Sequence, residues 1–467
     1  MSLTTALSVA TTGLRANGVQ SDLVARNIAN ASTEGYTRKE ASLITRNGGV
    51  FVESISRDVD SLLDRLDRSN ISAVARAETL ASGLKSYTDM LGQPDDATSP
   101  SAGLSQLYSS FITLTGTAYS GAAQLGVLDS AQRVAGQISS LSVTVNELGR
   151  EVDLNIRYDV SDMNERLVRI GQINARLLQA GGNGVEGAEL QDELGRLLDD
   201  IAGYMDIQVD SYADGAVNVY TSGGTELVRG RNVATIAYDS NAMTLMAGDL
   251  EITPGKAGAR GFSTGSLAGL FELATTSIPQ ISNELNEMAS LMIERFTAAD
   301  PTLSAGEFGL FADAAVLAGG AGGAGVAGRL IVNPKLLPAE GGDPSLLVKG
   351  LGTATTLPEG SITLVQNMMK AVDERPASAT LLGDNLSLQD FANSLVANQQ
   401  QQRVAAERSS EATRVAAATI SASRQNLQGV NVDDELQKLL VIEQSFAANA
   451  KVLTSVQLML DSLMDAV

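Results

Sequence analysis

The sequence contains no cysteine, no histidine and no tryptophan among its 467 residues. Without cysteine the chain cannot form a disulfide or a thiolate nucleophile, and without histidine it has neither an imidazole metal ligand nor an imidazole general base. Aromatic residues make up only 4% of the chain, whereas hydrophobic residues make up 44%. We therefore expect a core built from many small aliphatic contacts between helices, with few large aromatic clusters.

Long apolar runs and an excess of positive charge are also missing. No run of about 18 apolar residues is present, so no membrane insertion is expected. The N-terminus lacks a basic region followed by an apolar core, so a cleaved secretory signal is not expected. The chain has 33 basic and 54 acidic residues, and the formal net charge of −21 opposes binding to nucleic acid or to an anionic membrane.

Proline is absent between Pro100 and Pro254, which leaves room for long helices. Apolar residues at helical spacing predict helices over residues 58–91, 128–177, 189–205 and 265–299. From about residue 207 to 254 the pattern changes to short runs rich in Val, Ile, Thr and Tyr, separated by Gly- and Asp-containing turns. This pattern predicts a small antiparallel β-domain. The glutamine-rich run 398–402 is predicted to be the exposed face of a further long helix.

The predicted fold is mainly α-helical with an inserted antiparallel β-domain. In this interpretation the N- and C-terminal helices pair as a coiled coil, a long-helix bundle comes next, and the β-domain is outermost. The predicted parts are a terminal domain (1–40 with 430–467), a helix bundle (41–205 with 262–429, loop-rich over 312–360) and the β-domain (206–261). A chain of 467 residues is long enough for about two to four such domains.

Three motifs resemble catalytic or cofactor sites, but each lacks a necessary companion. Ser263, in a Gly-x-Ser-x-Gly sequence, would need a base, normally the histidine that this chain does not have. The glycines of 320–325 match a dinucleotide-binding pattern, but Pro334 interrupts any following helix. The acidic residues of 186–200 alternate with leucines, as on a solvated amphipathic helix. We predict no catalytic residue, no metal ligand and no cofactor, and hence no enzyme.

Both ends of the chain carry apolar residues at heptad spacing. In the N-terminal segment these are Leu3, Leu7, Leu14, Val24 and Ile28, and in the C-terminal segment they are Leu436, Leu439, Phe446, Leu453, Leu460 and Met464. Glu443 and Gln457 interrupt the C-terminal series. One such stripe cannot bury itself, so the two termini are predicted to pair. Leu440, Ala447, Val456 and Leu463 widen the C-terminal stripe, which predicts contacts with more than one helix and hence self-assembly.

The N-terminal apolar pattern ends at Ile28, and the small polar residues that follow favour a turn. Arg38, Lys39 and Arg46 then form a small basic island in an acidic protein. The island is expected either to dock against an acidic neighbour or to belong to a solvated linker.

The segment NIANASTEGYTRKE resembles the N-terminal signature of the bacterial flagellar axial proteins, the rod, hook and hook-associated family. The matching residues are Asn27, Ile28, Ala29, Asn30, Thr33, Gly35, Tyr36 and Arg38. Ser32 stands where the family usually has Asn, and Glu34 stands where Pro is common. The segment from Gly429 to Met464 is similar to the family's C-terminal signature, with Asn449 among the matching positions.

The middle of the chain is similar to the members of this family that join hook to filament. The resemblance implies a structural subunit that self-assembles as a ring in a helical tubular lattice, with the hook protein and the distal junction protein as neighbours. It also implies export through the flagellar type III channel to the outside of the cell, with a cytoplasmic chaperone on the C-terminal helix before export. The alternatives are another axial protein (hook, rod or distal junction subunit), a secreted adhesin or a wall-acting hydrolase.

The same resemblance assigns roles to the residues after the first helix. Asn30 to Arg46 would connect the terminal coiled coil to the first outer domain. Gly35 would let the backbone turn, and Tyr36 and Arg38 would pack against neighbouring subunits.

Overall fold

The computed structural model describes residues 3–33, 35–180, 184–352, 357–358 and 360–465. Contacts divide the chain into two compact units. Unit 1 comprises Met1–Arg76, Ile156–Ala268 and Glu411–Val467, and unit 2 comprises Ala77–Asn155 and Gly269–Ser410. Three long helices contribute residues to both units: α2 (Ser61–Leu91), α4 (Gly121–Ala180) and α11 (Leu388–Gln428). The mainly helical fold with small antiparallel sheets is confirmed, and the three-part division stays a prediction.

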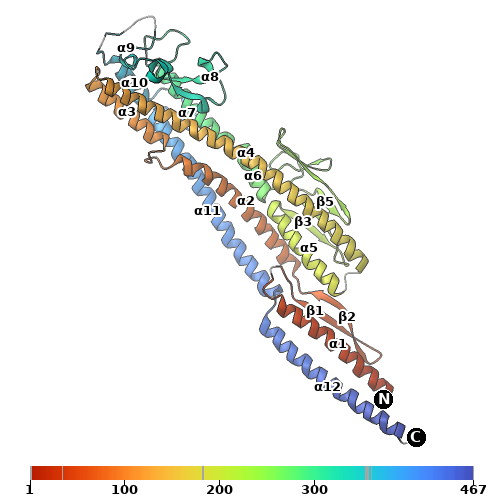
Figure 1. The fold of residues 1–467 in the computed structure, drawn as a ribbon. Coiled ribbons are helices and arrows are strands. Elements are labelled where there is room, and N and C mark those ends of the chain that lie inside the picture. Colours follow the sequence, from red (N-terminus) through yellow and green to blue (C-terminus); the bar gives the residue numbers. More distant parts are fainter. Residues whose placement is uncertain (1–2, 34, 181–183, 353–356, 359, 466–467) are drawn as a thin grey trace. The chain divides into compact units, whose positions relative to one another are not determined.

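Each helix expected from the apolar spacing is present (Figure 1). Besides α2 and α4, these are α5 (Val185–Tyr204) and the pair α6 (Ser266–Glu272) and α7 (Ile278–Ala298), which a π-helical turn over Leu273–Ser277 connects. The C-terminal region forms α11 and α12 (Val432–Asp465), separated by a short break after Gln428. Local periodicity was a good guide here because each helix buries one continuous apolar face.

The region from Ile207 to Glu251 forms two antiparallel sheets in unit 1. The first has the strand order β3-β4-β5-β6 and the second has the order β7-β8-β9. Their strands are β3 (Ile207–Ser211), β4 (Val217–Thr221), β5 (Glu226–Arg229), β6 (Asn232–Val233), β7 (Ile236–Asp239), β8 (Thr244–Ala247) and β9 (Leu250–Glu251). Buried residues such as Val219, Leu227 and Leu245 give the sheets an apolar face. The expected antiparallel strands are therefore confirmed.

Two asparagines of α4 hold these sheets to the helix. Asn174 donates to the carbonyls of Val217 and Gly230 at 2.8 Å each and accepts from the N–H of Val217 at 2.9 Å. Asn164, ten residues earlier, donates to the carbonyl of Ile236 and accepts from its N–H, both at 2.8 Å. Each side-chain amide thus pairs with backbone groups that a neighbouring strand would otherwise satisfy.

A β-hairpin follows α1 (Leu3–Ala29) where the sequence was expected to form a connector and then the helix bundle. Its strands are β1 (Lys39–Arg46) and β2 (Gly49–Arg57), paired antiparallel. Asn47 and Gly48 at the turn have φ values of 53° and 82°. Asn-Gly is the preferred sequence for such a two-residue hairpin turn, because both residues tolerate positive φ. This hairpin was not predicted from the sequence.

Unit 2 contains shorter elements beside its parts of α2, α4 and α11. They are α3 (Pro100–Gly116), β10 (Phe311–Asp313), α8 (Ala314–Leu317), β11 (Leu330–Val332), α9 (Leu346–Lys349), α10 (Thr363–Asp373), β12 (Ala379–Thr380) and β13 (Gly383–Asp384). β10 and β11 pair antiparallel. Three of the few phenylalanines meet in the core: the ring of Phe296 lies 6.1 Å from that of Phe111 and 5.1 Å from that of Phe311.

The glutamine-rich run of α11 is partly buried, contrary to the expectation of an exposed face. Gln399 is buried and donates to Glu284 of α7 at 2.8 Å, and Tyr87 of α2 donates its hydroxyl to Gln399 at 2.8 Å. Asn398 and Gln280 also donate to Glu284, both at 3.0 Å. Polar residues can occupy an interior when every group has a partner, which single-sequence periodicity cannot reveal.

Tyr87→Phe tests this buried network. The substitution keeps the ring but removes the donor to Gln399, so a buried acceptor loses its partner. We expect the free energy of unfolding to fall by about 1–3 kcal/mol, measured by urea denaturation. Tyr158→Phe is the matched control, because Tyr158 is 70% exposed and should tolerate the loss of its hydroxyl. Equal stability of the two variants would contradict a structural role for the network.

A candidate assembly surface on the terminal helices

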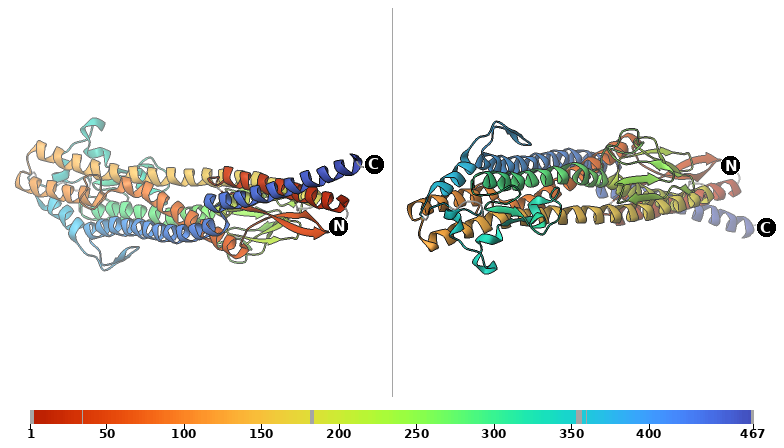
Figure 2. Two further views of the ribbon diagram at one scale, coloured as in Figure 1. Left: turned by 90° about the horizontal axis from the view of Figure 1, so that it is seen from below. Right: turned by 90° about the horizontal axis from the view of Figure 1, so that it is seen from above.

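The first and last described helices, α1 and α12, lie side by side and antiparallel within unit 1 (Figures 1 and 2). The amide of Asn17 donates to the hydroxyl of Ser445 at 3.0 Å, and the amide of Asn27 donates to the carboxylate of Glu435 at 3.0 Å. Val24 of α1 lies between these two polar contacts and is buried. Val456 of α12 lies beyond them and is also buried. The predicted pairing of the two termini is therefore confirmed.

The N-terminal stripe faces the interior of unit 1. Val24 is buried, and the remaining predicted residues are partly buried: Leu3, Leu7, Leu14 and Ile28. Asn17 occupies the heptad position after Leu14, where its polar contact with Ser445 fixes the alignment of the two helices. On another side of α1, Leu23 packs with Ile55 of β2 and Ala188 of α5.

On α12 the face against α1 differs in part from the predicted stripe. Leu439, Leu453 and Leu460 are partly buried as expected, and Asn449 lies next to Gly13 of α1. At the heptad positions that alternate with these three, however, the buried residue comes one position earlier than predicted. Glu435 and Val456 are buried, while Leu436 and Gln457 are exposed. The shift explains why the predicted stripe was interrupted at Gln457, and likewise at Glu443, where Ile442 is the partly buried neighbour.

The other faces of α12 are also apolar, and within the described part of the chain they are uncovered. Leu436 is 46% exposed, Phe446 is 49% exposed and Met464 is 80% exposed. Further exposed residues are Val432, Leu440, Val441, Val452, Leu458 and Met459. A helix with apolar residues on most of its sides is normally buried on most of its sides. These side chains define the candidate assembly surface of the chain.

The turn after α1 is held together by Asn27, which is almost fully buried. Its side-chain amide donates to the carbonyl of Lys39 at 3.0 Å as well as to Glu435. Its carbonyl oxygen accepts from the hydroxyl of Tyr36 at 3.0 Å and from the N–H of Lys39 at 3.2 Å. One side chain therefore joins α1, α12, the turn and the hairpin, and all of its hydrogen-bonding groups are used.

Other residues of the N-terminal signature also have roles within the chain. Asn30 donates to the carbonyl of Arg26 at 2.9 Å, at the end of α1. Gly35 has a φ of 71°, and a Cβ atom there would lie 2.6 Å from Cγ of Arg196. The position thus requires glycine both for its backbone conformation and for its close contact. Burial and the nearby Asp192 raise the pKa of Tyr36 to about 12, so its hydroxyl stays protonated and can donate.

The basic island separates into three different environments, and neither expectation for it holds as a whole. Lys39 is buried and bonds Asp192 of α5 at 2.6 Å, with its Nζ also 3.7 Å from the centre of the Tyr36 ring. Arg38 pairs with Asp58 and donates its backbone N–H to the carbonyl of Gln428 at 2.9 Å. Arg46 is exposed. Contacts of Tyr36 and Arg38 with neighbouring subunits stay a prediction.

Asp192 was not singled out from the sequence, yet it is the central anion beside the turn. It accepts from Lys39 at 2.6 Å, from the hydroxyl of Thr37 at 2.6 Å and from Arg57 at 3.0 Å. Its side chain and that of Lys39 are no more than 3% exposed. The sequence showed only an acidic residue on a helix among several, so no local signal could have identified it.

The catalytic-looking motifs have structural roles in the described residues. The backbone N–H and hydroxyl of Ser263 both contact the carboxylate of Asp206, at 2.8 Å and 3.4 Å. Residues 320–325 follow the short helix α8 instead of a strand. Over the described ranges, no group of acidic side chains is arranged to hold a metal ion. No helix among those same residues is long and apolar enough to cross a membrane.

Asp192→Asn tests the buried ion pairs. The substitution removes the negative charge that two buried cations share, so we expect the free energy of unfolding to fall by about 3–5 kcal/mol, measured by thermal or urea denaturation. Glu189→Gln is the control on the same helix, because the pair between Glu189 and Arg26 is exposed and should contribute less than about 1 kcal/mol. Similar losses in both variants would argue against this role of Asp192.

Two family models match the chain. The flagellar hook-associated protein FlgK helical domain matches residues 84–301, and the flagellar basal body rod FlgEFG protein C-terminal region matches residues 422–466. The first match lies across the long helices and the β-sheets. The second covers the end of α11 and all of α12, which carries the candidate assembly surface.

Flagellar hook-associated protein 1 of Salmonella typhimurium is 24% identical over 320 residues, covering 62% of this chain and 55% of that protein. Its counterpart of Bacillus subtilis is 22% identical over 507 residues, covering 98% and 97%. The chain thus spans about half of the length of the Salmonella protein and nearly all of the length of the Bacillus protein. A solved structure of the flagellar hook junction protein FlgK from Burkholderia pseudomallei is 17% identical, with a TM-score of 0.45, covering 54% of this chain and 47% of that one.

The two terminal signatures, the two matched regions and the relatives agree with one another. Over these regions the chain is similar to the bacterial flagellar axial proteins, flagellar hook-associated protein 1 among them.

Proposed function

We propose that this chain is a structural subunit of the bacterial flagellum that self-assembles where the hook meets the filament. The observation that carries the proposal is the set of exposed apolar residues on α12, a helix already paired with α1 on one side. An isolated chain would keep these residues in water at a cost in free energy. Packing against terminal helices of further copies would bury them.

The pairing of α1 with α12 makes such assembly geometrically simple. The antiparallel pair is fixed by Asn17 and Asn27, so each copy would present the same apolar faces in the same orientation. Identical subunits with two different complementary faces join head to tail and form rings or helical lattices. A ring of this kind can offer one side to the hook protein and the other to the distal junction protein.

The same surface suggests how the chain is handled before assembly. An exposed apolar helix is prone to non-specific association in the cell. A cytoplasmic export chaperone that covers α12 would prevent this until the chain leaves through the flagellar export channel. The proposed location is therefore the flagellum outside the cell, and the proposed role requires no catalytic residue.

A hook or rod subunit is the second candidate, and one observation favours it. The C-terminal match, residues 422–466, is to a region that is named for basal body rod proteins. The match to the hook-associated helical domain over residues 84–301 supports the junction role instead, because it covers the part of the chain outside the terminal helices.

Phe446→Asp tests the assembly surface. Phe446 is half exposed, so a charge there should leave the fold of the chain intact but place an unpaired carboxylate in the proposed interface. We expect the variant to be absent from isolated flagella, measured by immunoblotting, while its circular dichroism and thermal midpoint match those of the original chain. Ser455→Asp, an exposed polar position on the same helix, is the control and should still assemble.

Deletion of the whole chain tests the junction role. Cells without it should make complete hooks that carry no filaments and should release flagellin into the medium, as electron microscopy and analysis of the medium would reveal. Normal filaments on such cells would refute the proposal. Cells without hooks would instead assign the chain to the hook or the rod.

A further inference from the structure

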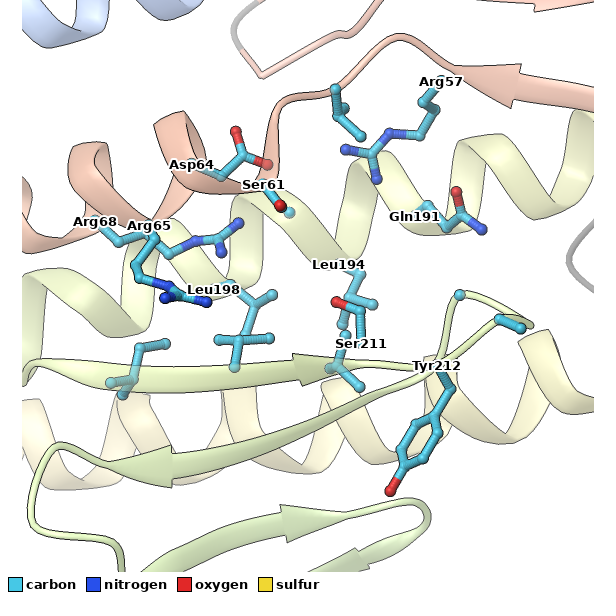
Figure 3. Close-up of a pocket in the computed structure, with 17 residues that line it drawn as sticks. Arg57, Ser61, Asp64, Arg65, Arg68, Gln191, Leu194, Leu198, Ser211 and Tyr212 are labelled. Atoms are coloured by element: carbon cyan, nitrogen blue, oxygen red, sulfur yellow. The ribbon is translucent and has the colours of Figure 1, made fainter.

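A cavity of about 340 Å³ lies within unit 1, away from the terminal helices (Figure 3). Its walls are the end of β2 and the start of α2, the helix α5, and the β3–β4 hairpin. The floor is apolar, with Leu194 and Leu198 of α5 opposite Val209 of β3. None of the functions considered so far uses this cavity.

The charged side chains of the wall are mostly cationic. Three arginines line the cavity, Arg57, Arg65 and Arg68, against a single carboxylate, Asp64. Asp64 is already engaged, because it accepts from Arg424 at 3.0 Å and from Gln428 at 3.0 Å. Figure 3 shows the guanidinium groups of Arg57, Arg65 and Arg68 around the same space. The three arginines of the wall therefore carry more positive charge than its single carboxylate can balance.

Arg57 and Arg68 are equally buried, each with 13% of its side chain exposed. Nε of Arg57 contacts the hydroxyl of Thr37 at 3.0 Å and the carboxylate of Asp192 at 3.0 Å. Asp192 must also serve Lys39, so two buried cations share one carboxylate. Burial lowers the pKa of Arg57, while the carboxylates of Asp192 and Asp64 act to raise it. A further anion in the cavity would help to balance the charge of these buried cations.

Arg65 and Arg68 differ in how far they are engaged. Arg68 donates to Asp199 at 2.8 Å. Arg65 is exposed at the edge of the cavity and has neither an ion pair nor a hydrogen bond within the described ranges. An incoming anion would thus meet the guanidinium of Arg65 at the edge of the cavity, with Arg57 and Arg68 adding positive charge to the same wall. Guanidinium groups bind carboxylates through paired hydrogen bonds, which suits this arrangement.

We propose that the cavity binds an Asp or Glu side chain of a second copy of this chain, held by Arg65 at its edge, when the chains assemble. The inference rests on the proposed self-assembly. A second copy fits the site by charge, because each chain carries 54 acidic residues against 33 basic ones and therefore presents carboxylates widely. The volume and the apolar floor suit one acidic side chain together with an apolar neighbour. Such a contact would give charge complementarity and a defined register between copies that are otherwise strongly acidic.

Zero-length crosslinking tests the proposal directly. Arg65→Lys keeps the positive charge, and a carbodiimide couples its amine only to a carboxylate in direct contact: the activated carboxyl forms an amide with the amine, and a urea is released. We expect flagella isolated from cells with this variant to yield a covalent dimer of the chain. Mass spectrometry should locate the bond between position 65 and an Asp or Glu of the other copy. Arg231→Lys, an exposed position on the turn between β5 and β6, is the control and should give no such dimer.

Charge reversal provides a second measurement. Arg65→Glu should lower the amount of chain retained on isolated flagella about tenfold or more, because like charges would then face each other. Arg65→Lys and Arg231→Glu should retain it. Thermal unfolding of purified Arg65→Glu should be unchanged, since Arg65 has no partner to lose among the residues that the structure describes.

The outcomes separate this inference from the proposed function. A chain that is present on flagella but gives no crosslink at position 65, or one to a different protein, would overturn the carboxylate site and leave the structural role intact. A chain that is absent from isolated flagella would overturn the structural role, and the carboxylate site with it.

Discussion

The buried amide of Asn27 is the interaction on which the terminal part of the structure depends. It bonds Glu435 of α12, both backbone groups of Lys39 and the hydroxyl of Tyr36. Loss of any of these partners would leave a buried polar group without a hydrogen bond, at the free-energy cost of its desolvation. The helices α1 and α12, the turn and the hairpin must therefore come together in one arrangement. The antiparallel pairing of the helices, the turn and the position of the hairpin all follow from this requirement.

The apolar faces of α12 are a consequence of that arrangement. Because Asn17 and Asn27 fix which side of α12 meets α1, Leu436, Phe446 and Met464 are directed elsewhere and stay exposed. In a dilute solution of the chain the exposure of these apolar side chains to water is unfavourable. Where many copies are present, burying them between copies favours association. Polar contacts inside one copy thus determine where the apolar contacts between copies would form.

Buried amides recur as alignment devices throughout this protein, which has few aromatic residues. Asn164 and Asn174 fix the two sheets to α4, and Gln399 with Glu284 aligns α11 with α7. Aliphatic side chains of similar size can slide past one another with little change in packing energy, whereas a buried hydrogen bond is lost on a small shift. A chain with a small aromatic content can in this way still specify a unique register.

The sequence by itself determined the long helices, the antiparallel strands of 207–254, the pairing of the termini and the likeness to flagellar axial proteins, because periodicity and signature motifs are local. Tertiary structure alone decided which face of α12 meets α1: the helix is apolar on most sides, so spacing could not choose between Glu435 and Leu436, and the bond from Asn27 did. It also decided that Lys39 pairs with Asp192, 153 residues away, and that Gln399 is buried. Such choices depend on partners distant in the chain, and a single sequence does not encode their proximity in any local pattern.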